Sequence, residues 1–203
     1  TVTLNRIDKR QITGTIGDRK ITVGPDIKIV LYQALLKSDR FEFVLQKCTE
    51  IGVSVFVPII CERCITRKIS TNKIQRWEKV IAEATEQSGR GVTPALQPVI
   101  SFSDACHSAN GPSLIASVNS DSIQLSSALK SKPFLNSHYT VSIFIGPEGG
   151  FTADESDIAQ RCGILKITLG PRVLRAETAG MVAATAVFYE YGELDRPPTG
   201  IKL

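Results

Sequence analysis

Two loops rich in glycine, proline and charged residues hold the side chains of this sequence best suited to chemistry. The first is Gly146-Pro-Glu-Gly-Gly-Phe151, directly after an apolar segment that ends at Ile145. Its three glycines within five positions permit positive φ angles and close approach of the backbone to a ligand. The loop lacks the signatures of a P-loop and of a dinucleotide-binding turn, so a nucleotide here would be held through its adenine and ribose by backbone groups. A tight strand-to-helix turn without a ligand is the alternative.

The second loop is Leu169-Gly-Pro-Arg-Val-Leu-Arg-Ala-Glu-Thr178, which also follows an apolar segment. The helix expected after it begins with unusually small residues, beside which a buried charge is costly unless it has a partner or a task. Arg175 and Glu177 therefore either pair with each other or with Arg172, or they serve a reaction. Loops at the carboxyl ends of parallel strands converge on one crevice, where open α/β sheets bind ligands.

The segments that must position these loops alternate between strand and helix. Apolar spacing predicts a helix over 39–51, and the nearly unbroken apolar run 53–60 predicts a strand buried on both faces. A capping box, Thr152-Ala-Asp-Glu155, starts another helix. The remaining elements expected are a helix over 72–88, strands over 113–118, 141–145 and 164–169, and a helix from about 177 to 191. This alternation predicts an α/β domain built on a parallel sheet.

The first part of the sequence has a different pattern. Turns containing Gly and Pro separate short strands, which is typical of a small antiparallel sheet, and the strands are expected over 2–4, 11–16, 21–23 and 27–32. Residues 1–40 carry eight Lys and Arg against four acids, whereas the rest of the chain carries sixteen of each. This basic excess indicates either a surface that faces nucleic-acid phosphates or the solvated face of a small β domain.

The five cysteines are expected to be reduced thiols. Cys61 and Cys64 have CxxC spacing, but zinc would need two further ligands, and a redox pair would open a helix rather than follow a strand. No metal is therefore predicted. The sequence has neither a run of about 18 apolar residues nor an apolar signal-peptide core, so we expect a cytoplasmic protein that does not span a membrane.

Taken together, the two loops closely resemble those of the RsmE family of ribosomal-RNA methyltransferases, which belong to the SPOUT superfamily. The likeness covers nearly all of residues 35–192, and it extends upstream through the segments 36–40, 46–53, 62–64 and 86–90. The family methylates N3 of a uracil in small-subunit (16S) ribosomal RNA with S-adenosyl-L-methionine as the methyl donor. The resemblance implies the same reaction, cofactor and RNA partner for this chain.

The resemblance also implies a domain organisation. Residues 1–34 would form part of a PUA-like, RNA-binding β domain, and residues 35–203 would form a SPOUT methyltransferase domain with a C-terminal trefoil knot. Such a knot is a rare exception to the rule against threaded chains, so sequence pattern alone does not predict it. Family members pair as homodimers around the knot. This sequence departs from the family at its start, where further N-terminal strands of the family are missing.

The candidate catalytic residues rest on their position in the two loops, and the cofactor contacts follow from the resemblance. Arg175 is expected to stabilise the uracil imide anion, Arg172 to position phosphate or substrate, and Glu177 to take the N3 proton or orient Arg175, while Glu148 is a weaker candidate for the base. The cofactor would lie against the two loops, with Ser117 as a weaker third contact. The cofactor-binding residues implied are Ser117, Ile145, Gly146, Pro147, Glu148, Gly149, Gly150, Leu169, Gly170, Arg172, Val173, Leu174 and Thr178.

Other functions remain open at this point. The nearest is a SPOUT methyltransferase that acts on another RNA position, such as a ribose 2′-hydroxyl or a tRNA base. A second is a non-catalytic RNA-binding module that keeps the fold but has lost turnover. A nucleotide-dependent dehydrogenase is disfavoured, because the sequence lacks both GxGxxG and the acidic ribose ligand downstream of it.

Overall fold

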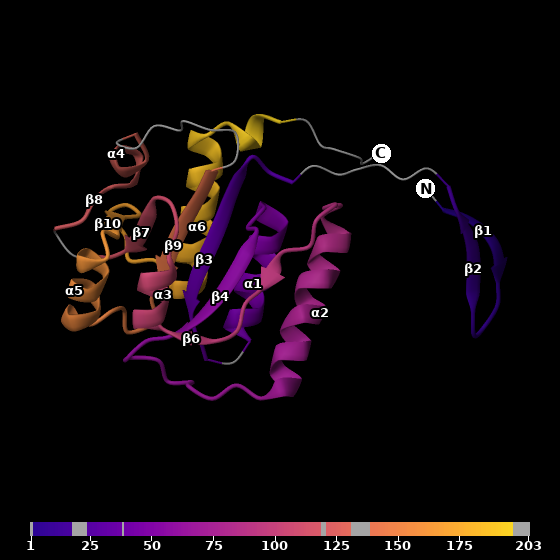
Figure 1. The fold of residues 1–203 in the computed structure, drawn as a ribbon, viewed down its shortest axis with the longest axis horizontal. Helices are drawn as coiled ribbons and strands as arrows, with labels where there is room; N and C mark the ends of the chain where they lie inside the picture. Colours follow the sequence, from indigo (N-terminus) through magenta and orange to yellow (C-terminus); the bar gives the residue numbers. More distant parts are fainter. Residues whose placement is uncertain (1, 18–23, 38, 119–120, 131–138, 197–203) are drawn as a thin grey trace.

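The computed structural model describes residues 2–17, 24–37, 39–118, 121–130 and 139–196 of the 203-residue chain. Its main body is an eight-stranded parallel sheet in the order β5-β4-β3-β9-β7-β10-β8, with β6 also beside β4 (Figure 1). The strands are β3 (Ile27–Ala34), β4 (Val55–Ile60), β5 (Ala95–Leu96), β6 (Ile100–Ser101), β7 (Ser113–Ala116), β8 (Ile123–Gln124), β9 (Tyr139–Ile145) and β10 (Leu165–Thr168). The predicted α/β class with a parallel sheet is confirmed.

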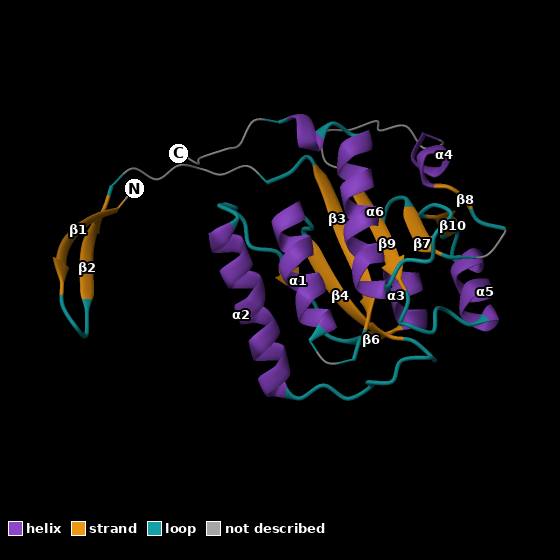
Figure 2. Ribbon diagram, turned by 180° about the vertical axis from the view of Figure 1, so that it is seen from behind, coloured by secondary structure: helices purple, strands orange, loops and turns teal. Residues whose placement is uncertain are grey.

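Helices cover both faces of this sheet (Figure 2). On one face α6 packs against β3 and β9 and contacts α1, with α2 beside α1, while α3 and α5 lie together on the other face. The helices are α1 (Arg40–Ile51), α2 (Thr71–Gln87), α3 (Phe102–Ser108), α4 (Leu125–Lys130), α5 (Ala153–Arg161) and α6 (Ala176–Glu190), followed by the 3-10 helix η1 (Glu193–Asp195). The elements predicted for this body agree with these bounds within two residues. The short helices α3 and α4 and the two-residue strands are too short to give a periodic signal.

β3 corrects the predicted domain boundary. The strand expected over 27–32 is present, but it pairs in parallel with β4 on one side and β9 on the other, so it belongs to the α/β sheet and not to an antiparallel one. Leu31 and Tyr32, which point to opposite faces of the strand, are both buried, as in a strand that helices cover on both faces. The division at residues 34 and 35 would cut this strand from its own sheet. The α/β body therefore begins no later than Ile27.

Local sequence explains where the helices start and stop. α1 ends at Gly52, whose φ of 127° is strained for any residue with a side chain and whose amide donates to the carbonyl of Cys48 at 3.1 Å. α5 begins with the predicted capping box. The Thr152 hydroxyl accepts from the Glu155 amide, and the Glu155 carboxylate accepts from the Thr152 amide at 2.9 Å. This box gives two of the free backbone amides at the helix N-terminus a hydrogen-bond partner within the protein.

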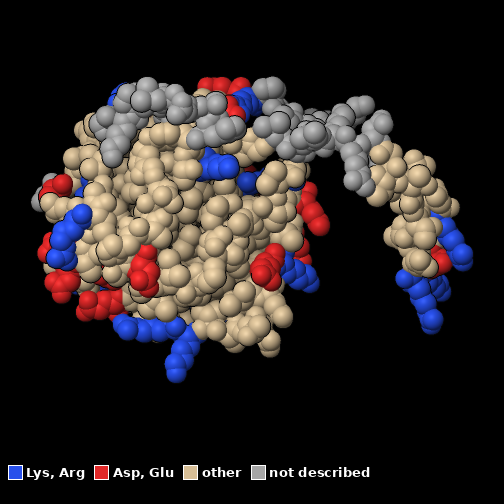
Figure 3. Space-filling view, viewed as in Figure 1, with Lys and Arg blue, Asp and Glu red and all other residues tan. Residues whose placement is uncertain are grey.

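A two-stranded antiparallel hairpin precedes the sheet. β1 (Val2–Ile7) pairs with β2 (Ile12–Ile16), and every residue of both strands is exposed. Figure 3 shows Lys and Arg side chains gathered at the tip of this hairpin, where Arg6, Lys9 and Arg10 are exposed. The small antiparallel sheet expected at the start of the chain is thus present as this hairpin, and the strand predicted over 21–23 lies outside the described residues.

The structure also bears on the states expected for the cysteines, on a metal site and on membrane-spanning helices. All five cysteines are free thiols, and four of them are buried. Across the described ranges, His, Cys, Asp and Glu side chains form no group of three or more that could hold a metal ion. No helix in the described part of the chain combines the length and apolarity needed to cross a bilayer.

Candidate active site

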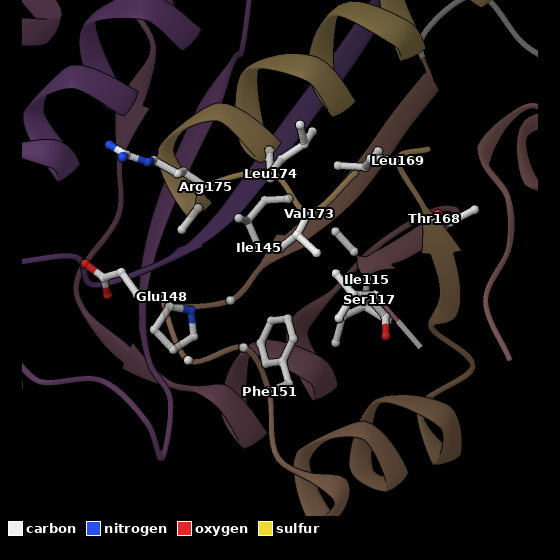
Figure 4. A pocket seen from close by; sticks show the side chains of 18 of the residues that line it. Ile115, Ser117, Ile145, Glu148, Phe151, Thr168, Leu169, Val173, Leu174 and Arg175 are labelled. Atoms are coloured by element: carbon white, nitrogen blue, oxygen red, sulfur yellow. The ribbon is translucent and has the colours of Figure 1, made fainter. Parts of the chain in front are cut away.

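A pocket lies at the carboxyl ends of three neighbouring strands, β9, β7 and β10. Its cavity volume is about 590 Å³, within the range of about 300–1,000 Å³ usual for small-molecule sites. The loop after β9 and the loop after β10 both line it, as does Ser117 directly after β7 (Figure 4). The expectation that the two loops converge on one crevice therefore agrees with the geometry.

The loop after β9 is a tight turn closed by its own aromatic side chain. The Gly150 amide donates to the Pro147 carbonyl at 2.9 Å, and Gly150 has a φ of 68°. A Cβ at Gly146 would lie 3.1 Å from the ring of Phe151, so a side chain there would press on the ring and require it to shift. Phe151 itself packs on Phe102, with ring centroids 5.1 Å apart. The turn therefore presents backbone to the pocket at Gly146, while Pro147, Glu148 and Phe151 also line it.

A second segment, the turn after β4, fixes this loop from outside. The guanidinium of Arg63 donates to the Gly149 carbonyl at 2.7 Å, and the Glu62 amide donates to the Glu155 carboxylate at 2.8 Å. The CxxC spacing belongs to the same turn, because the Cys61 amide donates to the Cys64 sulfur at 3.3 Å. Hydrogen bonding to the Cys61 side chain lowers the pKa of Cys64 to about 7, and both cysteines are buried. The two cysteines therefore pack inside the turn and help to hold its shape.

The loop after β10 is more exposed to solvent than the loop after β9. Gly170 has a φ of 108°, and its amide donates to the Thr168 hydroxyl at 3.2 Å. Val173 is 80 % exposed. The backbone then becomes extended at Arg175, the N-cap of α6, whose carbonyl accepts from the Thr178 amide at 2.9 Å.

The charged residues at the start of α6 differ from the sequence-based expectation. Arg175 is exposed rather than buried, whereas Glu177 is only 9 % exposed. In the described part of the chain the ion-pair partner of Glu177 is Arg40, at 4.0 Å, and neither Arg172 nor Arg175. Helix packing explains the difference, because α6 turns Glu177 toward the sheet body while its N-cap Arg175 remains at the rim of the pocket.

Arg40 also contacts the loop after β9. Its guanidinium lies 3.2 Å from the Glu148 carboxylate, which accepts a hydrogen bond from the Lys37 amide at 3.4 Å as well. Figure 4 shows the charged ends of Glu148 and Arg175 on one side of the pocket, away from the apolar side chains of its wall. The pocket thus has an apolar wall and a charged end.

Most residues implied by the resemblance line this pocket. Arg172, Arg175 and Glu177 do so, and Thr178 does not line it. The other lining residues among those implied are Ser117, Ile145, Gly146, Pro147, Glu148, Gly149, Gly150, Leu169, Gly170, Val173 and Leu174. Arg40, Arg63 and Phe151 also line it, although no role was predicted for them. Their segments were part of the resemblance, but only tertiary contacts show that they reach the pocket.

Comparison with known proteins identifies the family. Residues 24–188 match the family described as RNA methyltransferase domain. A protein of Mesomycoplasma hyopneumoniae named ribosomal RNA small subunit methyltransferase E is 34% identical over 167 residues, which are 79% of this chain and 69% of that protein. The chain belongs to the ribosomal RNA small subunit methyltransferase E family.

Other proteins similar to this chain support the assignment. The Synechocystis protein of that name is 34% identical over 164 residues, and the chain spans about half of its length, 53%. The structure of the Neisseria gonorrhoeae methyltransferase E, bound to S-adenosyl methionine, matches with a TM-score of 0.82 at 31% identity, over 93% of this chain and 77% of that one. A Legionella pneumophila methyltransferase solved with the same cofactor gives the same TM-score and coverage at 32% identity. The family resemblance seen in the two loops is confirmed.

Proposed function

We propose that this protein uses S-adenosyl-L-methionine to methylate N3 of a uracil in small-subunit ribosomal RNA. The observation that carries the proposal is the convergence of the two glycine-proline loops on one pocket of about 590 Å³. Two structures with the same fold at 31% and 32% identity hold S-adenosylmethionine. The proposed cofactor site is thus the pocket between the loops after β9 and β10.

The residues present fit this cofactor. Apolar side chains form one wall of the pocket and suit an adenine ring, namely Ile115, Ile145, Leu169 and Leu174 (Figure 4). The turn presents backbone at Gly146, where a Cβ would press on the Phe151 ring. Backbone of residues 146–150 and 169–174 would hold the ribose and the amino-acid part. When bound, the cofactor supplies an electrophilic methyl group on a sulfonium.

The charged end of the pocket would then bind the target base of the RNA. Uracil N3 carries a proton at neutral pH, and its loss spreads negative charge over O2 and O4. Arg175, exposed at the rim, would place a guanidinium beside that charge, and Glu177 would accept the proton. Arg172, also exposed, would position substrate or phosphate. The protein's contribution is positioning and electrostatics, which in-line methyl transfer mainly requires.

RNA binding is proposed for the start of the chain. The exposed Arg6, Lys9 and Arg10 at the hairpin tip form a basic surface that suits phosphates. We propose that the hairpin, rather than the whole of residues 1–34, forms the PUA-like, RNA-binding part of this chain, because β3 belongs to the α/β sheet.

A trefoil knot and a homodimer complete the proposal. The knot is proposed from the family resemblance, and it would involve the neighbouring strands β9, β7 and β10 and the helix α6, which packs on β3 and β9. Exposed apolar side chains on α1 and α6 suit a subunit interface, namely Phe43, Val182 and Tyr189. Light scattering of the purified protein at micromolar concentration tests the dimer, for which twice the chain mass is expected.

The function is tested in two steps. Calorimetry with S-adenosylhomocysteine measures cofactor binding, and incubation with small ribosomal subunits from a strain lacking the enzyme, followed by mass mapping, identifies the product. N3-methyluridine in the small-subunit RNA is the expected result. A 2′-O-methylated nucleoside, or methylation of tRNA alone, would contradict the proposed target. Cofactor binding without transfer to any RNA would instead support a non-catalytic module.

A further inference from the structure

Arg40 occupies a position that its own helix does not favour. It is the first residue of α1, and the partial positive charge of a helix N-terminus disfavours a cation there. The preceding Asp39 makes no side-chain capping hydrogen bond that would offset this. Arg40 also lines the pocket. Its location therefore needs an explanation outside α1.

The contacts of Arg40 supply that explanation. Its Nη1 lies 3.2 Å from Oε1 of Glu148 in the loop after β9, and its Nε lies 4.0 Å from Oε1 of Glu177 in the first turn of α6. One guanidinium thus donates a hydrogen bond to Glu148 after β9 and forms a longer ion pair with Glu177 after β10. Its planar fork of donors can serve two acceptors in fixed geometry, which the point charge of a lysine cannot.

A second observation concerns Oε2, the other carboxylate oxygen of Glu177. Oε2 is buried, and it has no hydrogen-bond partner within the described ranges. A buried acceptor without a partner costs free energy and is uncommon, which points to a donor that a ligand provides. Because Arg40 lies on the Oε1 side and Glu177 lines the pocket, a donor bound in the pocket would be the partner that Oε2 lacks.

We propose that Arg40 is a positioning residue that joins the two loops and orients Glu177 so that Oε2 accepts the proton of the target base. This inference rests on the proposed function. The N3–H bond breaks and its proton moves to Oε2, while the nitrogen electron pair forms the new N–C bond. The C–S bond breaks at the same time, its electrons remain on sulfur, and S-adenosylhomocysteine leaves. Glu177 then releases its proton to water.

A double-mutant cycle tests the link between Arg40 and Glu177. Single-turnover methyl transfer to small ribosomal subunits, with saturating S-adenosylmethionine, is measured for wild type, Arg40→Ala, Glu177→Gln and the double variant. We expect Arg40→Ala to slow transfer about tenfold, within the range for coupled contacts, and to have no further effect once Glu177 is replaced. The KM for RNA and the affinity for S-adenosylhomocysteine should stay within about twofold of wild type.

Three further measurements separate this role from a merely structural one. Added ethylguanidinium should restore part of the activity of Arg40→Ala, and Arg40→Lys, which keeps the charge but not the fork, should transfer more slowly than wild type. Arg76→Ala is the matched control, because Arg76 of α2 pairs at 2.8 Å with Glu42 of α1, the helix that also carries Arg40, and does not line the pocket. It should transfer methyl at the wild-type rate. Arg40→Lys is used for the cycle in place of Arg40→Ala if the alanine variant folds poorly.

The outcomes distinguish the two proposals. A wild-type protein that binds S-adenosylhomocysteine but methylates no RNA overturns the proposed function. Where wild type is active, a wild-type rate for Arg40→Ala, or additive effects of Arg40→Ala and Glu177→Gln, would overturn the positioning role. A loss of cofactor affinity equal to the loss of rate would also overturn it, because Arg40 would then act on the cofactor loop alone.

Discussion

At the scale of single residues, Arg175 and Glu177 stand two positions apart in opposite surroundings. Arg175 is exposed at the rim of the pocket, and Glu177 is buried beneath it, 4.0 Å from Arg40. An exposed guanidinium is free to meet a ligand, whereas a buried carboxylate is held in one place. This division suits a stabiliser of developing charge and a fixed proton acceptor.

We predict that Arg175→Ala lowers the rate of methyl transfer by about two to three orders of magnitude, the range for loss of one electrostatic stabiliser. The affinity for S-adenosylhomocysteine should be nearly unchanged, because the exposed side chain lies on the charged side of the pocket. Single-turnover kinetics and calorimetry measure the two quantities. An equal loss of cofactor affinity would show that Arg175 binds the cofactor instead.

Some of these residues can be found from sequence and others cannot. The glycine spacing and the charged loop after β10 mark Gly146–Gly150 and Arg172–Glu177 in advance. Arg40 lies over a hundred residues before either loop, and only the packing of α1 beside α6 brings it to Glu177. The burial of Arg175 was also misjudged, since sequence does not show which way a helix N-cap faces. A cation at a helix start, as at Arg40, is the local signal that could have prompted a search.

At the scale of elements, the loop after β9 depends on its glycine. We predict that Gly146→Ala weakens binding of S-adenosylhomocysteine about tenfold, because the new methyl group would lie 3.1 Å from the Phe151 ring and displace it. Calorimetry measures the effect. Gly24→Ala is the control, since nothing lies within 4 Å of the added carbon there. Unchanged affinity in Gly146→Ala would mean that the ring moves aside without disturbing the pocket.

The end of the chain secures the central strand. The buried Glu193 carboxylate of η1 accepts hydrogen bonds from the amides of Asp26 and Ile27 at 2.9 and 3.2 Å. We predict that Glu193→Ala lowers the free energy of unfolding by about 1–3 kcal/mol, since two amides at the start of β3 lose their acceptor. Urea denaturation measures this change. Glu83→Ala, which removes an exposed ion pair with Lys79, should have an effect below about 0.5 kcal/mol.

β3 itself shows what sequence pattern leaves undecided. Its apolar run identifies a strand, but the same run fits either sheet, because only the pairing partners separate a central parallel strand from an antiparallel one. The helix-strand alternation that reveals a parallel sheet starts only after this strand. The alternation from α1 onward was sufficient for the class of the fold, and the order of β9, β7 and β10 required the structure.

At the scale of the whole molecule, the hairpin is proposed to bind RNA and the α/β body to bind the cofactor and transfer the methyl group. We predict that replacing Arg6, Lys9 and Arg10 together by Ala weakens binding to small-subunit RNA while leaving S-adenosylhomocysteine affinity unchanged, because these side chains are exposed and lie outside the pocket. Each phosphate contact contributes about 0.7–0.9 to the slope of log affinity against log salt. The magnitude of this negative slope should therefore decrease by about two to three units in the triple variant. Filter binding between 50 and 200 mM salt measures it.

Substitution of three basic residues elsewhere provides the comparison. Arg76, Lys79 and Arg161 are exposed on α2 and α5, so their replacement by Ala changes net charge equally without touching the hairpin. If both triple variants lose the same affinity and slope, RNA senses only the total charge of the protein, and the hairpin has no specific role. If only the hairpin variant does so, the basic excess at the start of the chain is a phosphate-binding surface that delivers RNA to the pocket between the two loops.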